Sequence, residues 1–229
     1  MTNIRIVPAL DTPDLERAAA LAQALGDHRL VYGYKVGFAL GLAHGLPAVV
    51  AALRRFTTRP IIYDHQKAGT DIPDTGSLFA ATLAHAGVNE AILFPQAGPA
   101  TLAAWVDAAA AAGLKVIVGG LMTHAAYQVS EGGFLADEGI LSMYRLAMDK
   151  GVRAFVVPLT KPEQVRRIMD VLRAGGRTEL YSPGFGKQGG DPSLVGFLEN
   201  LNLIVGRSLL AAPDPVGYVE ELERKEWRA

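Results

Sequence analysis

The sequence contains no cysteine among its 229 residues. This excludes disulfide bonds, thiolate nucleophiles and cysteine metal sites, and it is compatible with a reducing cytoplasm. Neither sign of charge dominates, because 22 lysines and arginines stand against 23 acidic residues, so nothing favours a nucleic-acid partner. No apolar run approaches the roughly 18 residues of a membrane helix, and the N-terminus lacks the features of a secretion signal. We therefore expect a soluble cytoplasmic protein with a small-molecule partner.

Short apolar runs alternate with helical patterns along the whole chain. The runs predict eight strands, at 4–10, 30–37, 60–64, 91–94, 115–119, 154–158, 178–182 and 202–206. Strands that are each followed by a helix imply right-handed crossovers, and eight of them close a TIM (β/α)8 barrel, here as one domain over 1–229. An open doubly wound sheet is the alternative, but the glycine fingerprint that it usually carries after the first strand is missing.

Two details of the helices follow from the same patterns. The segment Thr12-Pro13-Asp14 predicts a capped helix start with proline at the first helical position. Between the second and third strands, Leu46, Val49, Val50 and Leu53 predict an apolar helical pattern.

A cluster of ionisable residues follows the third predicted strand. Asp64 ends the apolar run, and Lys67 and Asp71 come after it with no long linker between. In a site shielded from water, each carboxylate favours the charged ammonium and the ammonium favours both charged acids. The trio is therefore suited to hold a proton donor in a defined state. A solvated charge run in a surface loop is the alternative.

The active site of such a barrel lies at the C-terminal ends of its strands. Polar residues directly after the predicted strands are therefore the candidates for binding and catalysis. They are Asp11, Lys35, Asp64, Lys67, Gln96, Thr123, His124, residues 182–191 and Arg207.

Two glycine-containing segments follow the seventh and eighth strands, where barrels commonly bind phosphate. They are Ser182-Pro183-Gly184-Phe185-Gly186-Lys187-Gln188-Gly189-Gly190-Asp191 and Gly206-Arg207-Ser208. Glycines let main-chain N–H groups approach phosphate oxygens, and an arginine offers a bidentate charged fork. We predict a phosphate site here; a flexible glycine loop beside a surface arginine is the alternative.

Taken in order, these motifs resemble the orotidine 5′-monophosphate decarboxylase family along the whole chain. The matching positions are Asp11, Lys35-Val36-Gly37, the acid–lysine–acid cluster leading into Asp71-Ile72-Pro73 and Thr75, Met122-Thr123-His124, Pro183 to Gly186, Gln188 to Asp191, and Gly206-Arg207-Ser208. The resemblance implies decarboxylation of orotidine 5′-monophosphate to uridine 5′-monophosphate in pyrimidine biosynthesis, without a cofactor or metal, by a homodimer.

The resemblance also implies where the substrate is held. Asp11 and Lys35 would bind the ribose region, and Thr123 would bind the pyrimidine where the family usually has serine. Gln188 and Arg207 would bind the 5′-phosphate, together with the surrounding proline and glycine residues.

The catalytic cluster departs from the family pattern in its spacing. By the resemblance, Asp64 lies against the substrate carboxylate, Lys67 protonates carbon 6 as carbon dioxide leaves, and Asp71 and Thr75 enter from the other subunit. The family's lysine usually comes two residues after the first acid, whereas Lys67 comes three after Asp64. A separation of three does not keep two side chains on one face of a strand, so His65 is an alternative in the acid's place. We expect Asp64, because it directly ends the strand.

Two other functions stay open at this point. Decarboxylases and aldolases of keto sugar phosphates in the same superfamily use Mg²⁺ and carry an acidic metal ligand at the end of strand two, where this chain has Lys35. A noncatalytic barrel that binds a phosphate ligand would fit if the altered spacing has broken the cluster.

Overall fold

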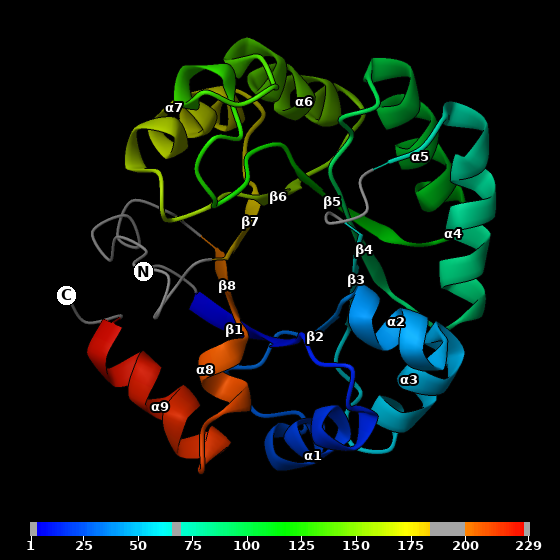
Figure 1. The fold of residues 1–229 in the computed structure, drawn as a ribbon, viewed down its shortest axis with the longest axis vertical. Helices are drawn as coiled ribbons and strands as arrows, with labels where there is room; N and C mark the ends of the chain where they lie inside the picture. The colour runs from blue at the N-terminus through cyan, green and yellow to red at the C-terminus, as the bar shows by residue number, and fades with distance from the viewer. Residues whose placement is uncertain (1–3, 66–69, 184–199, 227–229) are drawn as a thin grey trace.

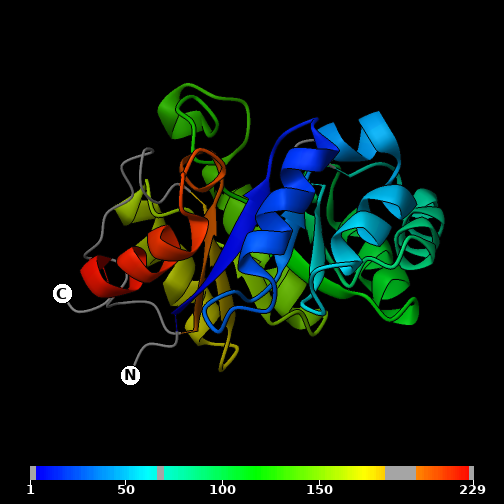
Figure 2. The ribbon, with the colours of Figure 1, turned by 90° about the horizontal axis from the view of Figure 1, so that it is seen from below.

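The computed structural model describes residues 4–65, 70–183 and 200–226. They form a closed barrel of parallel strands with helices around it (Figures 1 and 2). The strands are β1 (Ile4–Leu10), β2 (Tyr34–Val36), β3 (Ile61–Asp64), β4 (Glu90–Leu93), β5 (Lys115–Gly119), β6 (Ala154–Val156), β7 (Glu179–Ser182) and β8 (Leu201–Val205). Each strand pairs with the next, and β8 closes the ring against β1. The predicted TIM barrel is confirmed.

The described helices lie outside this ring (Figure 1). They are α1 (Leu15–Leu25), α2 (Phe38–His44), α3 (Leu46–Arg54), α4 (Gly76–His85), α5 (Pro99–Ala111), α6 (Asp137–Asp149), α7 (Pro162–Arg173), α8 (Arg207–Leu210) and α9 (Pro215–Glu226), with 3₁₀ turns η1 (Pro73–Thr75) and η2 (Val129–Glu131). No helix of the described segments combines the length and apolar character needed to span a bilayer.

Successive residues of each strand face opposite sides of the barrel wall. Ile61 belongs to the core layer that includes helix residues such as Leu21 and Val49, so it faces outward. Ile62 belongs to a second buried cluster made of residues from the strands and their ends, which fills the barrel interior. This alternation decides which residues at the end of β3 can reach the barrel mouth.

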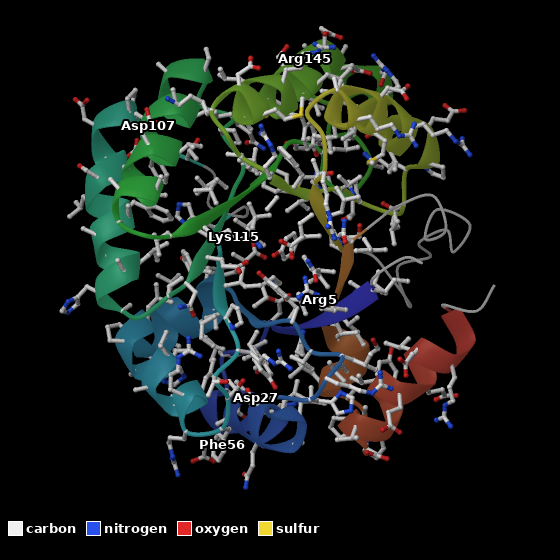
Figure 3. All side chains as sticks on the ribbon, turned by 180° about the vertical axis from the view of Figure 1, so that it is seen from behind. Arg5, Asp27, Phe56, Asp107, Lys115 and Arg145 are labelled. Atoms are coloured by element: carbon white, nitrogen blue, oxygen red, sulfur yellow. The ribbon has the colours of Figure 1, made fainter. Side chains whose placement is uncertain are left out.

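The N-terminal end of the barrel is occupied by an ion-pair network. Figure 3, viewed from behind, labels Arg5 and Lys115 close to the barrel axis. Glu179 accepts from Arg5 at 3.0 Å and from Lys115 at 2.5 Å, and Glu90 lies 3.6 Å from Lys115. These charges largely compensate one another within the network. The predicted site is expected at the opposite, C-terminal end of the strands.

Some predicted boundaries were wrong. Asp14 caps α1, because its Oδ1 accepts from the Arg17 N–H at 3.0 Å, so Pro13 lies outside the helix and is not its first residue. The predicted strand 30–37 is shorter in the structure, where β2 begins at Tyr34. The helical pattern predicted through Leu46 and Leu53 is confirmed as α3, and a separate helix, α2, precedes it across Gly45, whose φ of 75° cannot continue a helix.

Candidate active site

The C-terminal ends of β1, β2 and β3 bring three charged side chains together. Asp11 directly follows β1, Lys35 lies within β2, and Asp64 is the last residue of β3. The Lys35 Nζ donates to Asp11 Oδ1 at 3.0 Å and to Asp64 Oδ2 at 2.5 Å. Neighbouring parallel strands place their C-terminal ends side by side, so residues far apart in sequence meet here.

Two members of this group are almost completely removed from water, whereas Asp11 is exposed. Lys35 is 2% exposed and Asp64 is 1% exposed. Burial alone would lower the pKa of Lys35, but the Asp64 and Asp11 carboxylates outweigh it and raise that pKa above its ordinary value. Lys35 therefore stays protonated and holds both acids in fixed positions, as a preorganised charged site requires.

His65 faces the other side of the barrel wall. Its N–H continues the β3–β4 pairing by donating to Ile92 O at 3.1 Å. Its ring centroid lies 4.6 Å from that of Phe79 and 5.9 Å from that of Trp105, both on surrounding helices. Burial lowers the pKa of His65, which the Asp64 carboxylate only partly offsets. The strand alternation thus directs Asp64 to the mouth and His65 into an aromatic cluster.

The remaining acidic candidate lies in the connection between β3 and α4. Asp71 is exposed, and its Oδ1 accepts from the Ile72 N–H at 2.8 Å. Thr75, in η1, donates its hydroxyl to Ile72 O at 2.8 Å. Within one chain and among the described residues, no hydrogen bond or ion pair joins Asp71 to Lys35. Lys67 lies outside the described residues.

Residues after β4 and β5 meet at a tyrosine that the sequence did not single out. Gln96 donates its Nε2 to the Tyr127 hydroxyl at 2.7 Å, and that hydroxyl donates to Gly120 O at 3.0 Å. The exposed His124 packs edge-on against the Tyr127 ring, with centroids 5.5 Å apart. Thr123, beside it, is partly exposed. Tyr127 thereby couples two of the loops that carry site candidates.

The predicted phosphate-binding residues are only partly described. Pro183 follows β7, whereas Gly184, Gly186 and Gln188 lie outside the described residues. Gly206 follows β8, and a Cβ on it would lie 3.8 Å from Asp11 Oδ2. The turn into α8 therefore lies beside the Asp11 carboxylate. Arg207, the first residue of α8, is exposed and forms no ion pair within the described part of the chain.

Residues 5–222 match the model of the orotidine 5′-phosphate decarboxylase / HUMPS family. The chain belongs to this family. The match spans β1 to most of α9, so it includes both the Asp11–Lys35–Asp64 group and Arg207.

Curated relatives and solved structures in this family cover nearly the same length. Orotidine 5′-phosphate decarboxylase of Methanosarcina mazei is 32% identical over 213 residues, which are 93% of this chain and 90% of the relative. That of Methanosarcina barkeri is 34% identical over 92% of this chain and 89% of the relative. Orotidine 5′-monophosphate decarboxylase of Methanocaldococcus jannaschii, complexed with the inhibitor BMP, has a TM-score of 0.82 at 25% identity and covers 97% and 98% of the two chains.

Proposed function

We propose that this chain decarboxylates orotidine 5′-monophosphate to uridine 5′-monophosphate in pyrimidine biosynthesis. It would act as a cytoplasmic homodimer, with one catalytic domain over residues 1–229. The observation that carries the proposal is the Asp11–Lys35–Asp64 group, with Lys35 and Asp64 buried, at the barrel mouth of a chain that belongs to the orotidine 5′-phosphate decarboxylase family.

The geometry suits the chemistry of this reaction. Loss of carbon dioxide leaves a carbanion at carbon 6 with little internal delocalisation, so a fixed ammonium beside that carbon stabilises the charge as it develops. Lys67 supplies this ammonium and the proton. Asp64, which Lys35 holds at 2.5 Å, presents a fixed carboxylate against the substrate carboxylate, and Asp71 comes from the partner subunit.

Substrate contacts are assigned along the mouth. Asp11 and Lys35 bind the ribose region, and Thr123 and the partner's Thr75 complete the nucleoside pocket. The phosphate residues are Pro183, Gly184, Gly186, Gln188, Gly206 and Arg207. Phosphate binding far from carbon 6 contributes energy that orients the reacting ring.

A spectrophotometric assay with orotidine 5′-monophosphate tests the proposal directly. We expect loss of substrate absorbance with stoichiometric formation of uridine 5′-monophosphate. Absence of turnover by folded protein, together with turnover of a keto sugar phosphate, would instead place the chain in the sugar-phosphate branch.

Replacing Arg207 by alanine should chiefly raise KM. A charged hydrogen bond contributes roughly 1.5 to 3 kcal/mol, so the loss should raise KM about tenfold or more. Arg166→Ala, an exposed arginine on α7, is the matched control and should leave KM unchanged. Steady-state kinetics on both variants measure this, and an unaltered KM in Arg207→Ala removes Arg207 from the phosphate site.

Decarboxylation should persist after exhaustive chelation with EDTA. The metal-using branch carries an acid at the end of strand two, where this chain has Lys35, already engaged with two carboxylates. Among the described residues, no three histidine or acidic side chains are grouped as metal ligands. Activity that disappears in EDTA and returns with Mg²⁺ would contradict this expectation.

A further inference from the structure

A side chain from another helix donates a hydrogen bond to the connection between β3 and α4. Trp105 of α5 is 3% exposed, and its Nε1 donates to Ile72 O at 3.0 Å. The same carbonyl accepts from the Thr75 hydroxyl at 2.8 Å and from the Thr75 N–H at 3.3 Å. Among the described residues, the Trp105 bond is the only hydrogen bond that reaches 71–75 from an element other than the adjoining α4, whose Ser77 hydroxyl donates to Asp74 O at 3.5 Å.

The Trp105 indole also packs against residues on either side of the connection. A Cβ on Gly76 would lie 2.8 Å from Trp105 Cδ1 and 3.1 Å from Trp105 Cα, so the main chain at the start of α4 lies directly against Trp105. The Phe79 ring centroid is 4.6 Å from that of Trp105, and His65 stacks on the indole at 5.9 Å. Trp105 thus contacts the end of β3, the connection and α4.

Two candidate residues flank the carbonyl that Trp105 holds. Asp71 is bonded through its carboxylate to the Ile72 N–H, and Thr75 is bonded to the Ile72 C=O. Because both side chains are attached to one peptide segment, a shift of Ile72 O moves both. A displacement of about 1 Å in a positioning group can lower turnover on the order of a hundredfold.

We propose that Trp105 is a positioning residue that sets Asp71 and Thr75 for the active site of the partner subunit. Trp105 touches no reacting atom; it acts through Ile72 O. The inference rests on the proposed function, because it uses the decarboxylation as its readout and the sharing of Asp71 between subunits.

Two variants and two control variants separate an effect of Trp105 on the position of Asp71 and Thr75 from a general loss of structure. Trp105→Phe removes the N–H, and Gly76→Ala keeps it but displaces the indole; both should lower kcat roughly tenfold to a hundredfold, with a smaller change in KM. Tyr34→Phe removes another buried donor to a main-chain carbonyl, the 2.6 Å bond to Gly26 O, and Gly139→Ala adds a methyl at an exposed position of α6. Both controls should retain native kcat.

Mixed dimers then show which subunit's site Trp105 serves. Two differently tagged chains are coexpressed, and the mixed dimer is isolated by sequential affinity steps. Trp105→Phe paired with Lys67→Ala contains one site with intact Lys67 and well-placed Asp71, so it should show about half the native activity, by the symmetry of a twofold dimer. Paired with Asp71→Ala, it should show no more than the Trp105→Phe homodimer.

The opposite pattern, recovery with Asp71→Ala and none with Lys67→Ala, would mean that Trp105 serves its own chain's site and would overturn the proposal. Unchanged kcat in Trp105→Phe would overturn it as well. The proposal would also be overturned if neither Trp105→Phe mixed dimer recovered activity while the mixed dimer of Lys67→Ala with Asp71→Ala was active. Failure of the proposed function is recognised separately, because the wild-type chain would then be inactive in the same assay.

Discussion

Lys67→Ala and Asp71→Ala homodimers should each be nearly inactive, yet unfolding and refolding them together should restore about a quarter of the native activity. In a mixed dimer, one site carries both defects, while the other combines intact Lys67 of one chain with intact Asp71 of the other. Random pairing makes half of the dimers mixed, and each has one good site of two. Turnover per subunit, measured before and after joint refolding, gives the result.

The surroundings of Asp71 motivate this expectation. Asp71 is exposed, and two apolar side chains near it, Ile72 and Leu78, are 57% and 71% exposed. Exposed apolar side chains beside a candidate catalytic group suit contact with a second copy of the chain. Parent variants refolded separately are the control. A mixture that stays inactive, although mixed dimers are shown to form, would mean that Asp71 acts within its own chain.

Strand periodicity predicted the architecture because it depends on local alternation. The eight apolar runs became the eight strands, since a buried parallel strand needs only a short run of apolar and β-branched residues. Boundaries such as the Asp14 cap were less predictable, because Thr12 and Asp14 are both good caps and tertiary packing selects one.

The sequence predicted which residues of the site follow strands, but not which of them contact one another. Asp11, Lys35 and Asp64 were each expected at the mouth, but their common ion pair depends on the register of three neighbouring strands, which no local pattern encodes. Trp105 gave no signal at all: it lies in an alanine-rich helix, and its bond to Ile72 O joins side chain to main chain across 33 residues.

Asp64→Asn should lower kcat by roughly a hundredfold or more, whereas His65→Ala should be mild. Asp64 points into the mouth and contacts Lys35. Under the proposed function, neutralising it removes a fixed charge beside the reacting carbon, and loss of one preorganised electrostatic group at a reacting centre can lower turnover on the order of 10² to 10³. His65 points outward, and its Nδ1 has no hydrogen-bond partner among the described residues. His65→Ala therefore removes packing against Phe79 and Trp105 but no charge at the mouth.

Stability must be measured beside turnover, because both substitutions touch buried groups. Asp64→Asn leaves the buried Lys35 with Asp11 as its remaining described carboxylate, and breaking a buried ion pair costs about 3 to 5 kcal/mol. Urea unfolding shows whether the variant is folded under assay conditions. His65→Phe is the sharper control, since it keeps the aromatic packing and removes both ring nitrogens. The turnover of His65→Phe should stay near native. If His65→Phe were inactive and Asp64→Asn active, His65 would take the role proposed for Asp64. The altered spacing would then have changed which residue faces Lys67.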